Sequence, residues 1–409
     1  MTTVNDFYSQ LLDYYRSNDL IKKYLIPFFV VIPLSFYLYI DHTFWLRWFK
    51  QPDDSEVLTS WQWYSPIEVI ENRELIPLSI TKSDNRTISD DTLESAVEYA
   101  KSFNSLALLI SRNESLELEY YKEGYNRNTI IDSQSMHKGI LGIATVIALD
   151  KNLIPSIDTR VSDYIPEWKG DKRQEITIGN LLYMTSGLKQ IEYNKSPFSL
   201  GQRLFFGENI FSLVEDIGYA FEPGSSFDFN HINSQALHSV LTKSSGRRYS
   251  EFLRENLWKP LSGSFAQVRL DRKGGDARVF CCIQTKAMDW IRIGSMLANN
   301  GKLDGVQVIS EKWINIMLRG SNTNPNFAMH IWRGSPFSGG RLLSKPSGRI
   351  IPVSSPYLKE DVFFIEGRGG QRLYFIPSER LSIYRSGEIN FAWDDAYFIN
   401  LILNGVDNE

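Results

Sequence analysis

The sequence of 409 residues has only two cysteines and five histidines. The cysteines, Cys281 and Cys282, are neighbours and could pair with each other only through a strained ring. They are therefore predicted to be two small buried residues in a strand rather than a structural disulfide. The scattered histidines do not supply the ligand spacing that a zinc site needs, so we expect no metal and no cofactor.

An excess of charge of either sign is also missing. The chain has 44 basic and 48 acidic residues, which gives a net charge of −4. Nucleic-acid-binding proteins usually show a basic excess or a basic stripe, so we expect no nucleic-acid partner. The sequence contains no glycine-rich phosphate loop of the Walker type and no G-x-S-x-G elbow, which disfavours phosphate-loop enzymes and α/β-hydrolases.

Near the N-terminus, the run "YLIPFFVVIPLSFYLYI" from Tyr24 to Ile40 lacks any charged residue. Its length is at the short end of what spans a bilayer. Lys22 and Lys23 precede it, as expected for a cytoplasmic N-terminus, although Arg47 and Lys50 follow it and weaken that argument. No small-residue cleavage site follows, so the pattern favours an uncleaved signal anchor over a removed signal peptide.

These features predict a single-pass membrane protein. Residues 1–23 would be cytoplasmic, residues 24–40 would cross the membrane, and the remaining chain would lie on the extracytoplasmic (periplasmic) side. The alternative is that 24–40 forms a buried core helix or an amphipathic interfacial segment. The aromatic cluster that follows would suit the membrane–water interface; it consists of Phe44, Trp45, Trp48 and Phe49.

The remaining chain has strand patterns at both ends and helical patterns between them. Residues 41–88 show no clear period and are predicted to be a stalk or lead-in. A capped helix is expected over 89–103, followed by a hairpin of two β-like runs at 105–111 and 115–121. Strand patterns return at 361–387, and a helix closes the chain. With 43% hydrophobic residues and no evident linker, residues 89–409 are predicted to form one domain around one sheet.

The stretch "SQSMHKGI" places Ser135 and Lys138 one helical turn apart, in front of the apolar run "LGIATVIAL". A serine hydroxyl is a poor nucleophile without an adjacent base. Burial against apolar neighbours lowers the pKa of a lysine, so that a neutral amine can take the serine proton. By itself S-x-x-K is a weak signal, because Ser135 could equally cap a helix while Lys138 lies on a solvated face.

The wider sequence strengthens the catalytic interpretation of Ser135 and Lys138. From about residue 95 to the C-terminus the chain resembles the serine β-lactamase-related hydrolases, in particular the branch of class C β-lactamases and 6-aminohexanoate-dimer hydrolases. Five stretches carry this resemblance in the family's order, at residues 133–168, 176–188, 222–241, 281–313 and 366–377. It implies an α/β (α+β) fold of the β-lactamase/transpeptidase-like type: an antiparallel sheet built from both chain ends, helices on both faces and a mostly helical insertion.

The resemblance also implies roles for individual residues. Ser135 would be the nucleophile, Lys138 its proton acceptor, and the Ser135 N–H one half of an oxyanion hole. The other half would come from the third-motif strand near Gly369 and Gly370. Arg368 would either reach a substrate carboxylate or point to solvent.

The second motif departs from the family pattern. The family's tyrosine position falls on Phe229, which has no hydroxyl to act as acid or base. Three explanations are open: a weakened or inactive relative; Lys138 as sole acid–base, helped by water or His231; or a phenol from elsewhere, with Tyr193 the best candidate. His231 could equally be a loop residue that contacts only the backbone, and His137 is expected to face away from the Ser135–Lys138 pair.

Two functions therefore remain open. The first is a membrane-anchored serine hydrolase that cleaves a small-molecule or peptide-like amide or ester through an acyl-enzyme. The second is a non-catalytic protein on the same fold that binds a peptide or acyl ligand. Ser135 and Lys138 favour the first, and Phe229 favours the second.

Overall fold

The computed structural model describes residues 41–72, 78–191 and 194–407. The predicted membrane segment 24–40 lies outside these ranges, as does Tyr193. Within them, no helix has both the length and the apolar character needed to cross a bilayer.

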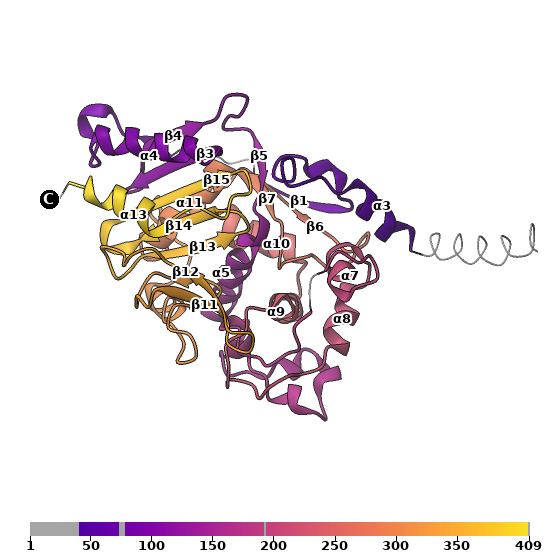
Figure 1. The fold of residues 1–409 in the computed structure, drawn as a ribbon. Helices are drawn as coiled ribbons and strands as arrows, with labels where there is room; N and C mark the ends of the chain where they lie inside the picture. The colour runs from indigo at the N-terminus through magenta and orange to yellow at the C-terminus, as the bar shows by residue number, and fades with distance from the viewer. Residues whose placement is uncertain (1–40, 73–77, 192–193, 408–409) are drawn as a thin grey trace, which may run out of the picture.

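The principal sheet has seven strands and is built from both ends of the chain (Figure 1). Its neighbouring strands are antiparallel, except that the short edge strand β2 runs parallel to β4. The predicted hairpin of residues 105–121 is confirmed as β3 and β4. In spatial order the strands are β10 (Trp332–Arg333), β13 (Phe363–Gly367), β14 (Gln371–Ile376), β15 (Leu381–Gly387), β3 (Ser105–Arg112), β4 (Ser115–Tyr121) and β2 (Ser79–Ile80).

The central strands are buried on both faces. Every residue of β3, β14 and β15 is buried, and successive side chains point to opposite faces of the sheet. Along β14, Leu373 and Phe375 join one hydrophobic cluster, while Tyr374 and Ile376 join the other. The sheet therefore lies between two apolar layers, in agreement with the helices on both faces that the family resemblance implied.

Helices cover both faces. One cluster contains side chains of α5 (His137–Asp150) and α11 (Ala287–Ala298), and the other contains side chains of α4 (Asp90–Ser102) and α13 (Asp395–Asn404). Ser89 caps α4 by accepting a hydrogen bond from the N–H of Thr92, as the sequence predicted. The middle of the chain is mostly helical, with α6 (Ile178–Leu182), α7 (Leu200–Phe206), α8 (Ile210–Asp216), α9 (His231–Ser245) and α10 (Tyr249–Leu253).

Residues 41–72 pack on the domain, although the sequence suggested a stalk. Helix α3 (His42–Lys50) buries Phe44, and strand β1 (Ile67–Glu71) buries Ile70. Strand β1 pairs with β6 in a second sheet of order β1-β6-β7-β5. The polar composition hid this docking because the pairing partners lie some two hundred residues later. The other strands and helices are β5 (Ile130–Asp132), β6 (Phe265–Arg269), β7 (Gln284–Lys286), β8 (Lys302–Leu303), β9 (Val306–Gln307), β11 (Gly340–Ser344), β12 (Arg349–Pro352) and α12 (Glu311–Met317).

Two glycines let α5 approach its neighbours closely. A Cβ on Gly139 would lie 2.5 Å from the Ile365 side chain on β13, and a Cβ on Gly142 would lie 2.8 Å from the Met329 carbonyl oxygen. The helix that follows Ser135 is thereby held directly against the strand that borders the site.

Candidate active site

Ser135 and Lys138 form the centre of the site. Ser135 lies in a short 3₁₀ turn, Gln134–Met136, between β5 and α5, and Lys138 is the second residue of α5. The Lys138 Nζ donates to Ser135 Oγ at 3.2 Å and also to the Phe280 carbonyl oxygen. The amine is therefore within proton-transfer distance of the hydroxyl.

Burial changes the charge state of this amine. The Lys138 side chain is only 3% exposed, and desolvation lowers its pKa to about 7, while the Glu366 carboxylate acts in the opposite direction. At neutral pH a large fraction of Lys138 is thus neutral and able to accept a proton. The sequence predicted this desolvation from the apolar run after Lys138.

The segment 280–283 holds the serine turn through backbone contacts. Besides the Phe280 contact to Lys138, three hydrogen bonds join the two segments: Ser133 N–H to Ile283 O at 3.0 Å, Cys282 N–H to Gln134 O at 3.1 Å, and His137 Nδ1 with Cys281 O at 3.1 Å. His137 also contacts the Tyr249 hydroxyl, so it faces away from the Ser135–Lys138 pair, as expected.

The two cysteines of this segment correct a sequence prediction. Both are buried, as expected, but they lie in the loop before β7 rather than in a strand, and they are joined as a disulfide between neighbouring residues. Cys282 has a φ of 81°, and this left-handed backbone conformation turns the chain at the pair.

Asp132 fixes the serine turn through hydrogen bonds to Gln134. Gln134, directly before the serine, has a φ of 51°. Asp132 accepts hydrogen bonds from the Gln134 backbone N–H at 2.8 Å and from its side-chain amide at 3.0 Å. The other Asp132 oxygen accepts from Arg269 at 2.8 Å and Gln284 at 2.9 Å. This buried carboxylate satisfies four donors and holds the left-handed residue in place.

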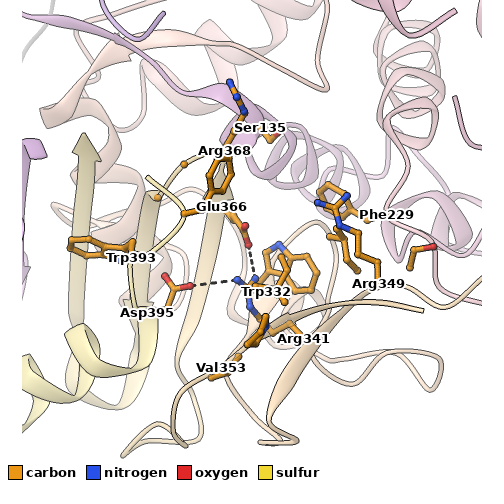
Figure 2. A pocket seen from close by; sticks show the side chains of 18 of the residues that line it. Ser135, Phe229, Trp332, Arg341, Arg349, Val353, Glu366, Arg368, Trp393 and Asp395 are labelled. Carbon is orange, nitrogen blue, oxygen red and sulfur yellow. Dashed lines mark hydrogen bonds and ion pairs between the residues drawn. The ribbon is translucent and has the colours of Figure 1, made fainter. Parts of the chain in front are cut away.

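A cavity of about 1160 Å³ opens at Ser135 (Figure 2). Most of the residues that the sequence singled out line it, namely Ser135, Phe229, His231, Arg368, Gly369 and Gly370. Lys138 is not among the lining residues and reaches the cavity only through its contact with Ser135. Tyr193 lies outside the described residues. Gln190 and Ile191, shortly before it in the sequence, line the cavity. Residues that lie 94 to 235 positions after Ser135 in the chain thus meet it at one place.

Phe229 occupies the place beside the amine. Its ring centroid lies 5.3 Å from Lys138 Nζ, and its ring stacks on Trp332 at 5.8 Å. The backbone N–H of Phe229 donates to Leu343 O at 3.0 Å, which ties the second motif to the β11–β12 hairpin over the cavity. An aromatic ring of the expected shape is therefore present without its hydroxyl.

His231 begins helix α9 and is held between two aromatic rings. It stacks on Phe280 at 5.3 Å and meets the edge of Phe205 at 6.0 Å. Nδ1 is buried without a hydrogen-bond partner among the described residues. Burial, and secondarily the Lys138 charge, lowers the His231 pKa well below its usual value, so the ring is neutral. Since His231 lines the cavity, Nε2 is the ring nitrogen that can face it.

The third-motif glycines lie in the β13–β14 turn. Gly369 and Gly370 have φ values of 72° and 88°, and the Gly370 carbonyl accepts from Arg385 at 2.8 Å. The strand reaches the serine turn at Gly367, where an added Cβ would be 2.6 Å from the Ser133 carbonyl oxygen. The sequence placed the second oxyanion donor near Gly370; the residue of this strand that touches the serine turn is Gly367, three positions earlier.

The free backbone edge of β13 falls at Glu366. The Gly334 N–H donates to Val362 O, so Val362 directs its backbone groups toward β10. Antiparallel strands alternate in this respect, so Phe364 and Glu366 point the same way. Strand β10 pairs only with residues 363 and 364, which leaves the Glu366 N–H beyond the pairing that the structure describes.

A cluster of buried charges forms the wall near β13. Figure 2 shows Arg341 between Glu366 and Asp395; Arg372 contacts Asp395 at 2.7 Å and Glu366 at 3.6 Å. Burial opposes ionisation of Glu366, but the two guanidinium groups outweigh it, so the Glu366 pKa lies below its usual value. The sequence did not reveal this cluster because Arg341, in the β11–β12 hairpin, lies far in sequence from Glu366 and Asp395.

Arg368 has a partner that the sequence did not suggest. It forms two hydrogen bonds of 2.7 Å to the carboxylate of Asp54, in the lead-in segment. Both side chains are well exposed. Arg368 therefore neither points freely to solvent nor presents an unoccupied guanidinium to a substrate.

Comparisons with known proteins give the family and the fold that this chain resembles. A family model described as Beta-lactamase matches residues 90–281. A 6-aminohexanoate-dimer hydrolase of Paenarthrobacter ureafaciens is 24% identical over 230 residues, which are 53% of this chain and 57% of the relative. The match thus spans little more than half the length of that protein.

Solved structures share the fold over a longer range. A Bacillus anthracis protein with a provisional assignment as a 6-aminohexanoate-dimer hydrolase superposes with a TM-score of 0.67 at 17% identity, covering 85% of this chain and 92% of that one. A family VIII carboxylesterase gives a TM-score of 0.59 at 17% identity, covering 78% and 99%. The β-lactamase/transpeptidase-like fold that the sequence predicted is confirmed.

Removing the Asp132 charge is expected to loosen the serine turn. In Asp132→Asn the new amide faces the Arg269 and Gln284 donors, and Arg269 loses its buried carboxylate. We expect unfolding free energy to fall by about 3–5 kcal/mol and the rate of Ser135 labelling by a fluorophosphonate to fall with it. Urea denaturation and labelling kinetics measure the two effects.

The matched control is Asp289→Asn. Asp289 is also buried and accepts from Ser264 and Thr285, but it has no contact with the serine turn. This variant should lose stability while the folded protein keeps its labelling rate. Equal losses of labelling in both folded variants would contradict a specific role for Asp132.

Proposed function

We propose that this chain, whose residues 90–281 match the Beta-lactamase family model, is a membrane-anchored serine hydrolase that cleaves a carboxylic ester or amide through a Ser135 acyl-enzyme. The observation that carries the proposal is the buried Lys138 amine in hydrogen-bond contact with the Ser135 hydroxyl. The similar proteins include a 6-aminohexanoate-dimer hydrolase and a carboxylesterase.

The proposed reaction needs one proton carrier. Ser135 Oγ attacks the carbonyl carbon as its proton passes to the neutral Lys138 amine. When the tetrahedral intermediate collapses, the bond to the leaving group breaks and the leaving atom takes a proton from the Lys138 ammonium. Water then attacks the acyl-enzyme as its proton passes to the neutral Lys138 amine. When this second intermediate collapses, the bond to Ser135 Oγ breaks and Oγ takes the proton back from Lys138, which restores the hydroxyl and releases the acid.

We assign the stabilisation of the oxyanion to two backbone N–H groups, those of Ser135 and Glu366. The first lies in the turn before helix α5, and the second is on the strand edge that approaches this turn at Gly367. Donors fixed in this way stabilise the charge that develops on the carbonyl oxygen without reorganising.

Because Phe229 has no hydroxyl, this position offers no phenol to assist the leaving group. We assign part of the role of the family's tyrosine to His231. A neutral imidazole whose Nδ1 is buried between Phe280 and Phe205 carries its proton more favourably on Nε2. Nε2–H can then donate a hydrogen bond to the leaving atom while Lys138 supplies the proton. His231 would thus stabilise departure without itself changing its protonation state.

The second candidate function is non-catalytic binding of an acyl or peptide ligand in the same cavity. The Phe229 ring favours it, because Phe229 and Trp332 with the nearby Leu343, Ile351 and Val353 give the cavity an apolar wall. Under the first function the same wall would receive the acyl group. The substrate's identity depends on these side chains and not on the fold.

Covalent labelling distinguishes the two functions. Incubation of the full chain with a fluorophosphonate is expected to add one phosphonyl group at Ser135, detected by mass spectrometry of the peptide. Ser135→Ala should abolish the adduct, and Ser133→Ala, directly before the same turn, should retain it. An unmodified wild-type protein of native fold would contradict the hydrolase and support the binding protein.

The pH dependence of labelling should report the Lys138 amine. The base must be neutral, and burial places its pKa at about 7. The labelling rate should therefore be constant above this pH and fall about tenfold for each unit below it. Glu366→Gln removes a charge that raises the Lys138 pKa, so its profile should shift to lower pH. A profile that continues to rise toward pH 10 would show an ordinary solvated lysine.

Leaving-group dependence tests His231. With esters of one acyl group, His231→Leu should reduce kcat more for an alkyl alcohol than for a nitrophenol, because a poor leaving group needs more stabilisation. His231→Asn retains an N–H donor and should recover part of the loss, and Phe229→Tyr should raise turnover of the alkyl ester. A uniform loss for all leaving groups would mean that His231 only maintains the structure.

A further inference from the structure

Helix α3 is fixed rigidly to the domain by its inner face. Phe44 is fully buried against Phe206. The buried Arg47 guanidinium donates to the backbone carbonyls of Ser65, Phe206 and Asp271 at 2.8 Å each. These contacts join parts of the chain that are far apart in sequence, so the orientation of α3 is set by the folded domain.

The outer face of the same helix carries two large apolar side chains beside the polar His42 and Lys50. Leu46 and Phe49, three residues apart and therefore on one side of the helix, are 52% and 77% exposed. Phe198 and Leu200, at the start of α7, are 70% and 57% exposed. We call these four side chains the α3–α7 patch. An amphipathic helix normally turns its large apolar side chains inward, so Leu46 and Phe49 on the outer face indicate a further apolar environment.

The two halves of the patch are contiguous. The Trp45 ring meets the Phe198 ring at 6.2 Å and stacks on Phe49 at 5.9 Å. In Figure 1, α3 and α7 lie beside each other at one end of the molecule, away from the β11–β12 hairpin. The patch is therefore a feature of the folded domain and not only of the N-terminal sequence.

We propose that the α3–α7 patch rests in the interface of a lipid bilayer. The uncharged run from Tyr24 to Ile40 ends one residue before Asp41, which precedes α3. With a rise of about 1.5 Å per residue, Phe49 lies only about 12 Å along the helix from Asp41. A membrane entered by the uncharged run would thus be within reach of Leu46 and Phe49, and aromatic side chains are favoured at that depth.

This placement has a consequence for the hydrolase domain. A helix fixed to the domain by Arg47 and resting on lipid would hold the domain in one orientation, whereas an anchor alone would let it rotate. The proposal depends on the membrane segment but not on the chemistry at Ser135, so the two can fail separately.

The test uses the full chain in phosphatidylcholine–phosphatidylglycerol vesicles. A bimane fluorophore is attached to Phe198→Cys without reductant, because the native cysteines are paired. Phe198 is remote in sequence from the membrane run, so its environment reports the folded patch. We expect aqueous iodide to quench the label at position 198 several-fold less than a label at a water-exposed site of the same protein. Lipids that carry a nitroxide on the acyl chain should quench it.

The matched control is Phe391→Cys. Phe391 is 77% exposed and lines the cavity, so its label should be quenched by iodide and not by the nitroxide lipid. Leu46→Ser with Phe49→Ser removes apolar surface without touching the core and should restore iodide access at position 198.

Three results would overturn the proposal. The label at 198 could behave like the one at 391, or the chain could fail to float with the vesicles. Protection from iodide could also rise with protein concentration without nitroxide quenching, which would assign the patch to a second copy of the chain.

Discussion

The free energy needed to remove the Lys138 amine from water is the constraint on which the rest of the site depends. The apolar helix α5 and the Phe229 ring surround this amine, while the Ser135 hydroxyl and the Phe280 carbonyl accept its hydrogen bonds. Desolvation disfavours its charged form and so makes it a base at neutral pH. The same desolvation is useful only if the hydroxyl stays within reach, which explains the rigid support under the serine turn.

Other buried charges nearby are compensated, and the contrast is informative. Glu366 and Asp395 each contact Arg341 and Arg372, so all four groups keep their charges despite burial. Lys138 has no carboxylate within ion-pair distance in the part of the chain that the structure describes. Buried groups that are paired with opposite charges keep their ionised forms and make up the cavity wall. A buried amine without such a partner changes its protonation state near pH 7.

The sequence was informative where a feature is local. The hairpin of residues 105–121, the capped helix α4 and the Ser135–Lys138 pair depend on neighbours within a few residues, and their patterns predicted them. The contribution of segment 280–283, the Arg368–Asp54 pair and the free edge at Glu366 depend on contacts between distant segments. No periodicity encodes such contacts, so the packing of residues 41–72 on the domain could not be predicted and these residues were expected to form a stalk.

Replacing the motif tyrosine with Phe229 changes the chemistry rather than simply removing it. A ring at 5.3 Å from Lys138 keeps water away from the amine and favours the neutral base, although its face also attracts the ammonium form. A group with a pKa of about 7 can both accept and return a proton at neutral pH. One such carrier is sufficient when the leaving group departs readily, and becomes limiting when departure needs its own acid. The substitution therefore bears on which leaving groups the site can expel, and a nearby neutral donor such as His231 would widen that range.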